Sequence, residues 1–391
     1  MCCKCSSFNG IEKYPKLRFQ GFTIPWTEIE IGKAFQVTRG YVLPATVVRQ
    51  DASEEYIYPV YSSQTKDNGL MGYYNDYLYE NAITWTTDGA NAGTVHYRPG
   101  KFYCTNVCGV LLSDEGNANR CVAEILGSIS KKYVSYVGNP KLMNNVMSEI
   151  KIYVPTIAEQ KKIDEFISVI DHRIEKQREL IEHLKKYKRG AITLILSNKD
   201  ASWKSGRLGD FITINRGGSP RPIEAFITND PDGVNWIKIG DVSEDSLYIT
   251  QTAEKITAEG SRKSRKVFAG DLILSNSMSF GRPYIMQIEG CIHDGWLLLR
   301  DDGACFDKKY LCYYLASDEV LAQYKKYAAG SCVSNLNSEL VSNVFIEFPP
   351  LEKQKEIASS LELLDERINC EIKLLDKLLL IKKGLLQSLF I

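Results

Sequence analysis

The chain has 391 residues, of which 44% are hydrophobic, and its 48 basic and 48 acidic side chains leave a formal net charge of zero. This length predicts two or three domains, and the apolar content allows sizeable cores. No apolar run approaches the roughly 18 residues of a membrane helix, so we expect a cytoplasmic protein that makes no contact with a membrane. The neutral balance argues against nucleic-acid binding through an overall positive charge, so any such contact must use local charge or a partner.

Residues 1–19 form an N-terminal extension that begins MCCKCSS and has no apolar core, unlike a secretory signal. The 11 cysteines of the chain are scattered and odd in number, which favours reduced thiols over a disulfide framework. Cys2, Cys3 and Cys5 lack a fourth ligand and the usual spacing of a zinc site. We therefore expect no metal in this chain.

Residues 20–154 predict a strand-rich globule. Runs that favour β-strands cover 60–63, 82–87, 93–97 and 107–112, and turns rich in Gly, Asn and Asp separate them. One helix is predicted over 120–132, and a closing strand over 150–154 precedes a proline.

Residues 155–200 predict one long helix. Apolar residues recur at alternating steps of four and three, as in a coiled coil, and the proline stands where it starts a helix. Gln177 and Lys188 interrupt this apolar line, which we call the seam. Its apolar members in this helix are Ile163, Ile167, Ile170, Ile174, Ile181 and Leu184.

The same order then recurs. Residues 201–348 predict a second strand-rich globule, with strands over 236–240, 271–275, 283–288 and 296–299 and one helix over 308–326. Residues 349–391 predict a second long helix, interrupted at Glu371 and Lys382. The apolar seam members of this helix are Ile357, Leu361, Leu364, Ile368, Leu375 and Leu378.

The recurrence is an internal repeat. Gln354 lies 194 residues after Gln160, and the seam and its polar interruptions match at this offset without a gap. The globules open alike as well, because Trp26 and Trp203 are each followed six residues later by glycine and then by Arg-Gly. Such a repeat fixes the architecture and argues that the two seams pair within one chain.

Catalytic motifs are missing from the sequence. It has no Gly-x-x-x-x-Gly-Lys-Ser/Thr phosphate loop, no Gly-x-Gly-x-x-Gly fingerprint and no Asp/Asn-Pro-Pro-aromatic motif of amino-methyltransferases. His293-Asp294 could form a catalytic pair, yet no nucleophile motif accompanies it. We therefore expect a binding protein with no catalytic residue.

Polar and aromatic loops occupy matching places in the two globules. Amides can read adenine, arginine can read guanine, and basic clusters suit phosphates. The candidate DNA-binding residues of the first globule are Arg39, Ser62, Gln64, Lys66, Tyr73, Tyr74, Thr86, Asn91 and Lys101. Those of the second are Arg216, Arg221, Arg262, Lys263, Arg265, Lys266, Asn276, Ser279, Arg282, Ser331 and Asn335.

The paired Pro-x-x-x-x-Gln-x-x-Ile helix openings, the Lys-Arg-Gly and Lys-Lys-Gly endings and the Trp-to-Gly starts closely resemble the specificity subunits of type I restriction-modification systems. The resemblance covers nearly the whole chain, but residues 1–11 have no place in it. It implies an α+β fold in which two pseudo-repeated strand-rich α/β domains are separated by two long helices that form an intramolecular antiparallel coiled coil. Residues 20–154 and 201–348 would be target recognition domains 1 and 2, and residues 155–200 and 349–391 the central and C-terminal coiled-coil helices.

The resemblance also implies a division of labour. Each globule would read one half of a bipartite double-stranded DNA target, and the helices would set the spacer and dock two modification subunits. Those subunits would use S-adenosylmethionine to methylate adenine at N6, and restriction subunits would use ATP and magnesium, so this chain needs no cofactor. Two alternatives are a stand-alone nuclease or hydrolase that uses Asp88 or His293-Asp294, and a coiled-coil scaffold whose globules bind protein or glycan.

Overall fold

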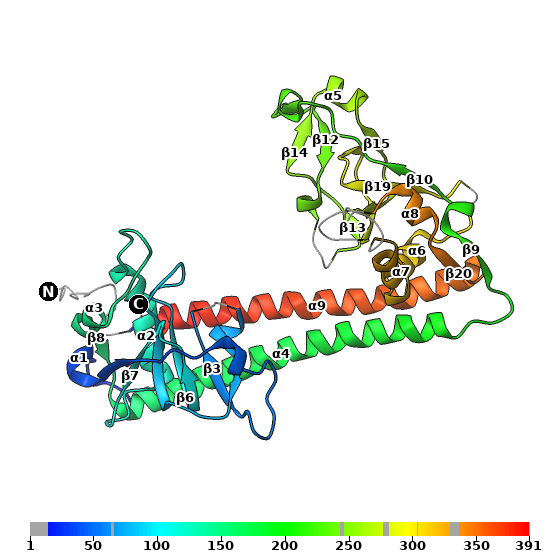
Figure 1. The fold of residues 1–391 in the computed structure, drawn as a ribbon. Coiled ribbons are helices and arrows are strands. Elements are labelled where there is room, and N and C mark those ends of the chain that lie inside the picture. Colours follow the sequence, from blue (N-terminus) through cyan, green and yellow to red (C-terminus); the bar gives the residue numbers. More distant parts are fainter. Residues whose placement is uncertain are drawn as a thin grey trace. The chain divides into compact units, whose positions relative to one another are not determined.

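The computed structural model of the chain describes residues 15–63, 66–242, 246–276, 281–302, 304–328 and 336–390. It divides into two compact units, residues 1–178 with 373–391 and residues 179–372. Each unit holds one globule and part of both long helices, α4 (Ile157–Ser197) and α9 (Leu351–Phe390). Figure 1 shows the elements of each unit.

The globule of the first unit is built on a six-stranded mixed sheet of order β2-β7-β5-β6-β3-β4, in which only the β3–β6 pair is parallel. Its strands are β2 (Gln36–Arg39), β3 (Tyr58–Tyr61), β4 (Leu70–Tyr74), β5 (Tyr79–Thr86), β6 (Val95–Cys104) and β7 (Cys108–Leu112). A separate pair joins β1 (Thr27–Glu30) to β8 (Lys151–Val154). The helical elements are α1 (Ile31–Ala34), α2 (Arg120–Ile129) and α3 (Asn144–Glu149), with 3-10 turns η1 (Ala45–Val47), η2 (Lys66–Gly69) and η3 (Ser130–Tyr133).

The core of the first unit joins this sheet to the long helices. Ile125 and Leu126 of α2 are fully buried and share one cluster with Ile163 and Ile167 of α4. Trp85 belongs to the same cluster, and its indole Nε1 donates to the carbonyl oxygen of Leu142 at 2.9 Å. Trp85 is therefore a core residue, 1% exposed.

The globule of the second unit has two five-stranded sheets, of order β10-β19-β16-β17-β13 and β11-β14-β12-β18-β15, and a separate β9–β20 pair. Its strands are β9 (Lys204–Arg207), β10 (Thr213–Arg216), β11 (Ile227–Thr228), β12 (Val234–Ile237), β13 (Tyr248–Ile249), β14 (Glu254–Ile256), β15 (Arg265–Val267), β16 (Leu272–Ser275), β17 (Pro283–Met286), β18 (Gly290–Ile292), β19 (Trp296–Arg300) and β20 (Phe345–Phe348). The helical elements are α5 (Ala258–Arg262), α6 (Lys308–Leu315), α7 (Asp318–Ala328) and α8 (Ser338–Ser342), with 3-10 turns η4 (Leu208–Asp210), η5 (Ile223–Ala225) and η6 (Ile239–Asp241).

The single helix predicted over 308–326 is wrong, because the structure has two helices there, α6 and α7. The chain turns between them, and the hydroxyl of Ser317 accepts a hydrogen bond from the backbone N–H of Val320 at 3.4 Å. This turn lets Val320 and Tyr324 of α7 enter the core that α6 already fills, and both are fully buried. Packing outweighed the continuous helical pattern of the sequence.

The repeat seen in the sequence is also a repeat of contacts. The opening strand pairs antiparallel with the closing strand in both globules, β1 with β8 and β9 with β20. A side chain on Gly32 would meet the Cβ of Ser148 at 3.0 Å, and one on Gly209 would meet the Cβ of Ser342 at 2.7 Å. Each glycine is therefore required because a short helix, α3 or α8, packs directly against it.

The two long helices run antiparallel within each unit. In the first unit Lys382 of α9 pairs with Asp171 of α4 at 2.9 Å, and in the second Lys188 of α4 pairs with Asp365 of α9 at 2.6 Å. The repeat exchanges these two pairs, because Asp365 and Lys382 lie 194 residues after Asp171 and Lys188. The chain thus has the predicted α+β architecture with an intramolecular antiparallel coiled coil.

Every apolar seam residue predicted from the sequence is buried or partly buried. The polar interruptions Gln177 and Glu371 are 3% and 6% exposed, and Glu371 pairs with Arg367 at 2.6 Å. In the part of the chain that the structure describes, no helix has the length and apolar character to cross a membrane. The same residues contain no group of three or more potential metal ligands, while Cys2, Cys3 and Cys5 lie outside them.

Candidate nucleic-acid interface

A glutamine at the start of each long helix fixes the neighbouring globule. Gln160 is 1% exposed; its Nε2 donates to the carbonyl of Pro155 at 2.9 Å, and its Oε1 accepts from Asn119, the N-cap of α2, at 2.6 Å. Gln354 is fully buried and donates to the carbonyl of Pro349 at 2.9 Å. Its Oε1 accepts from the backbone N–H of Asp307, the N-cap of α6, at 2.9 Å. The Pro-x-x-x-x-Gln motif thus joins each long helix to the first turn of a globule helix.

A repeated aspartate makes a second joint. Asp171 accepts from Arg120 of α2 at 2.8 Å while it pairs with Lys382. Asp365 accepts from the hydroxyl of Tyr313 in α6 at 2.8 Å while it pairs with Lys188. Each aspartate therefore ties a globule helix to both long helices of its unit, which gives the candidate DNA-facing loops a rigid base.

Three candidates of the first globule surround a small polar pocket. Ser62, Thr86 and Asn91 all line it. The amide of Asn91 donates to the carbonyl of Ser63 at 3.0 Å, and the hydroxyl of Ser62 accepts from Thr105 at 3.0 Å. Thr86 is only 7% exposed, and the hydrogen bonds of Ser62 and Asn91 to neighbouring loop residues hold their loops in place.

The pocket is also lined by a cation that the sequence pattern does not reveal, Arg98. Arg98 is 6% exposed and lies 3.7 Å over the ring of Tyr61. Its Nε donates to Thr84 at 3.1 Å and its Nη2 to the carbonyl of Asn68 at 2.8 Å. Burial lowers the pKa of Arg98, since no carboxylate among the described residues forms an ion pair with it. No local signal predicts a buried arginine, because its burial depends on the sheet around it.

The imidazole of the neighbouring His96 is kept neutral. Burial, together with the positive charges of Arg98 and Lys382, lowers the pKa of His96 from 6.5 to about 4. An uncharged His96 beside a buried arginine avoids repulsion between two cations in a low-dielectric site.

The other described candidates of the first globule lie on its strands, Arg39 and Lys101 exposed and Tyr73 and Tyr74 partly buried. Arg39 ends β2 and Lys101 lies on β6 with its Nζ 4.5 Å over the ring of Tyr77. Tyr73 and Tyr74 lie on the edge strand β4, and Tyr74 meets Tyr103 edge to face at 5.6 Å. Gln64 and the side chain of Lys66 lie outside the described residues.

In the second globule several candidates converge on one carboxylate that the sequence had assigned to a possible catalytic pair. Asp294 accepts from Ser219 at 2.7 Å, and its Oδ2 lies 3.4 Å from Arg221 and 4.0 Å from Arg216. Its carbonyl accepts from the amide of Asn276 at 2.9 Å. The hydrogen bond from Ser219 lowers the pKa of Asp294, with a smaller effect of the nearby positive charges. Asp294 thus holds two exposed arginines at one surface.

The basic residues of α5 and β15 continue this surface. Arg265 donates its Nε to the carbonyl of Arg216 at 3.2 Å, so the two neighbourhoods are contiguous. Lys263 pairs with Glu259 at 2.9 Å and lies 4.6 Å over the ring of Phe226. Arg262, Lys263, Arg265 and Lys266 are all exposed, as residues that bind phosphates must be.

Other candidates do not join this surface. Arg282 precedes β17 and lines a different cavity, described below. Ser279, Ser331 and Asn335 lie outside the described residues.

The geometry of His293 does not favour catalysis. Its Nδ1 accepts from the backbone N–H of Gly295 at 2.7 Å, and the backbone N–H of Ile239 lies 3.2 Å from its Nε2. Burial lowers the pKa of His293, against the opposing effect of Asp294. An imidazole whose nitrogens both face backbone N–H groups is a structural link, with no free nitrogen for a substrate.

Comparison with known proteins places this architecture. The sequence model described as "Type I restriction modification DNA specificity domain" matches residues 23–186 and again 201–380. The specificity subunit of the type I restriction enzyme MjaVIII from Methanocaldococcus jannaschii is 23% identical over 405 residues, which cover 94% of this chain and 93% of that protein. The specificity subunit of the type I restriction enzyme MpnII from Mycoplasma pneumoniae is 31% identical over 153 residues, 38% of this chain.

The chain spans about half the length of two of the M. pneumoniae relatives, 45% of the MpnII subunit and 49% of a putative type I specificity subunit that is 34% identical over 154 residues. Among solved structures, the S subunit of a type I restriction-modification system from M. genitalium has a TM-score of 0.58 at 17% identity, and the match covers 96% of this chain and 99% of that one. This similarity to the M. genitalium structure supports the fold.

Proposed function

Because the chain belongs to the type I restriction-modification DNA specificity family, we propose that it is a DNA-reading subunit without catalysis of its own. Target recognition domain 1, residues 20–154, reads one half of a bipartite sequence, and target recognition domain 2, residues 201–348, reads the other. The helices of residues 155–200 and 349–391 set the spacer between the half-sites. A subunit with this task works on double-stranded DNA in the cytoplasm.

One observation carries the proposal: a repeated set of structural contacts, which we call the frame, supports a different exposed surface in each unit. The frame repeats the strand pair, the buried glutamine and the bridging aspartate in both units. The exposed surfaces differ in their ion pairs: among the described residues, two exposed arginines meet one carboxylate in the second globule, where Arg216 and Arg221 lie beside Asp294, and the first globule has no such arrangement. Two different surfaces on one frame suit an asymmetric target, as symmetric dimers suit palindromes.

The long helices supply the second line of support, because their outward faces carry apolar residues that repeat. At the repeat offset Val169 corresponds to Leu363, and they are 69% and 67% exposed. Two further pairs behave alike, Leu180 with Leu374 and Tyr187 with Ile381. Each unit carries one member of each pair.

Repeated exposed apolar positions indicate a repeated partner. We assign these faces to two copies of a modification subunit, which supplies S-adenosylmethionine chemistry at adenine N6. Restriction subunits that use ATP and magnesium would complete the complex. The neutral charge of this chain agrees with partners that contact much of the DNA backbone.

The test is a domain exchange followed by methylation-aware sequencing of DNA from cells that express the chain with its modification subunit. Replacing residues 20–154 with the corresponding domain of a relative should change one half-site and leave the other half-site and the spacer unchanged. A change in both half-sites would contradict separate reading. DNA cleavage by the purified chain with magnesium alone would favour the nuclease alternative.

A further inference from the structure

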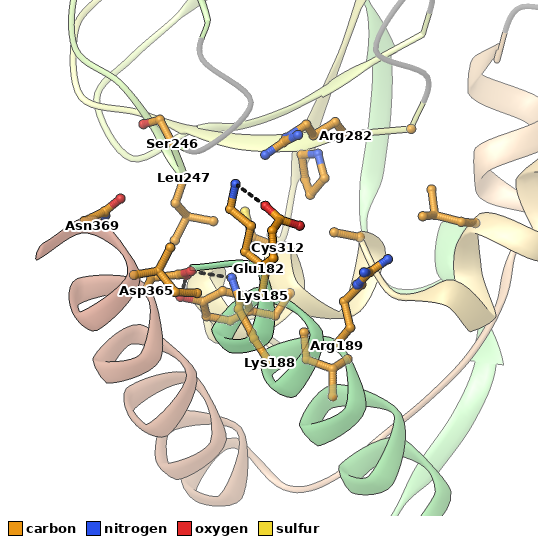
Figure 2. A pocket seen from close by; sticks show the side chains of 17 residues that line it. Glu182, Lys185, Lys188, Arg189, Ser246, Leu247, Arg282, Cys312, Asp365 and Asn369 are labelled. Atoms are coloured by element: carbon orange, nitrogen blue, oxygen red, sulfur yellow. Dashed lines mark hydrogen bonds and ion pairs between the residues drawn. The ribbon is translucent and has the colours of Figure 1, made fainter. Parts of the chain in front are cut away.

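A cavity in the second unit has a composition that DNA reading does not explain. It has a volume of about 550 Å³ and lies between the long helices and the body of the second globule, within residues 182–369. Its walls come from α4, α9, α6, α7 and the start of β17, with Leu247 beside β13 (Figure 2). This volume is within the range of cavities that hold small organic ligands.

Two of the four basic side chains in the cavity are already neutralised. Lys188 pairs with Asp365 at 2.6 Å and lies 4.7 Å over the ring of Tyr313. Lys185 lies 4.0 Å from Glu182. These two contacts use both carboxylates that line the cavity, so its remaining charge is positive.

The other two basic side chains carry that charge. Arg189 extends from α4 and Arg282 from the segment before β17, on opposite walls in Figure 2. Among the described residues, neither guanidinium has a carboxylate within ion-pair distance. The guanidinium of Arg282 lies 5.8 Å from the ring of Tyr284. Two guanidinium groups without carboxylates in one concave site are suited to a phosphate or a carboxylate, which they bind through paired N–H donors.

Most of the remaining lining is apolar, and Ser246 and Asn369 are its polar members. Ile192 and Ile368 come from the two long helices, and Leu247, Pro283 and Leu321 come from the globule. A DNA backbone phosphate carries a hydrated sugar on either side and gains little from such a surface. An anion with an apolar body can satisfy both halves of the cavity.

We propose that this cavity binds a small organic anion, with its phosphate or carboxylate on Arg189 and Arg282 and its apolar body against Leu247 and Ile368. The ligand would connect the long helices of the second unit to the strands of the second globule. Occupancy would therefore stabilise that junction by mass action. This proposal stands independently of the DNA-reading function.

The probe for the test is 1-naphthyl phosphate, titrated into the full-length chain and followed by calorimetry. Binding with one-to-one stoichiometry is expected, with weaker binding of inorganic phosphate, which lacks the apolar body, and of 1-naphthol, which lacks the charge. Arg189→Gln and Arg282→Gln should each weaken binding by about tenfold, since each removes one charge-assisted contact. Lys186→Gln, which removes a charge from an exposed residue of α4 outside the cavity, should leave the affinity unchanged.

A second variant protects the test against a folding defect. Leu247→Asp adds a negative charge to the partly buried wall and should abolish binding while the melting temperature of the unliganded chain stays close to that of the parent. Absence of one-to-one binding to the parent chain, or unchanged affinity in the Arg189→Gln/Arg282→Gln double variant, would overturn the proposal. So would competition by any DNA duplex together with sequence-independent loss of DNA affinity in the arginine variants, because the cavity would then be a backbone contact.

Discussion

The two globules place their positive charge in opposite ways. The first buries a cation, Arg98, under a tyrosine ring and between hydroxyl and carbonyl oxygens. The second keeps its cations Arg216 and Arg221 exposed and holds them with the carboxylate of Asp294. The frame around both repeats the strand pair, the buried glutamine and the bridging aspartate, and these side chains contact different partners in the two units. The joints between globule and long helices therefore repeat in the two units, whereas the polar surfaces differ.

The tryptophans that open the globules should give the largest difference. Trp26 is 1% exposed and packs against Phe390, with 6.1 Å between ring centroids, while Trp203 is only partly buried. We expect Trp26→Ala to cost about 4 kcal/mol and Trp203→Ala about 2 kcal/mol, because the first leaves a larger cavity. Hydrogen exchange of α2 measures the loss of stability in the first globule, and hydrogen exchange of α6 measures it in the second. Trp26→Phe should recover most of the free energy that Trp26→Ala loses. Equal losses at Trp26 and Trp203 would show that burial of the tryptophan does not determine the cost of replacing it.

The glutamines at the start of the long helices, Gln160 and Gln354, should give the next largest difference. Gln354→Ala leaves a backbone N–H and a carbonyl, of Asp307 and Cys305, without their partner, whereas Gln160→Ala leaves the amides of Asn117 and Asn119, which can turn to new partners. We expect costs of about 3 and about 2 kcal/mol respectively, because fixed backbone groups cannot relax. Urea-dependent hydrogen exchange at the N-termini of α6 and α2 checks this. A larger cost at Gln160 would contradict the argument.

Acid should also destabilise the two globules to different extents. The pKa of His96 falls from 6.5 to about 4 on folding, so the unfolded chain binds its proton first and stability is lost as pH falls from about 6.5 to 4. At pH 4.5 the loss of folding free energy amounts to about 2.5 kcal/mol. Asp294 opposes the same effect at His293, so the second globule should lose less.

Hydrogen exchange of each globule at pH 7 and pH 4.5 tests this difference. His96→Gln should remove the additional acid sensitivity of the first globule. If the His96→Gln chain stays as acid-sensitive as the parent, another group controls the loss.

The smallest expected effect concerns reading of the target. Asp294→Asn should free Arg216 and Arg221 to contact any phosphate, so affinity for unrelated duplexes rises by about threefold to tenfold and discrimination at one half-site falls. The matched control is Asp88→Asn in the first globule, whose carboxylate accepts from Asn139 and holds no arginine. Gel shifts with duplexes altered in either half-site check both variants. Equal loss at both half-sites would contradict a local role of Asp294.

The sequence alone determined what local periodicity and self-comparison can reveal. The repeat at 194 residues follows from comparing the sequence with itself. The seam and the closing strand over 150–154 follow from short patterns, because helices and strands impose their own spacing. The same patterns predicted one helix over 308–326, where the need to bury Val320 and Tyr324 produced two.

Tertiary structure alone decided which polar groups meet. Arg216 and Asp294 are 78 residues apart. They meet because β10 pairs with β19, and Asp294 lies in the loop that precedes β19. Arg98 has no local signature, since an arginine on a strand is ordinarily exposed and only the surrounding β5 and β3 bury it. Long-range pairing sets such contacts, and no short window of sequence records it.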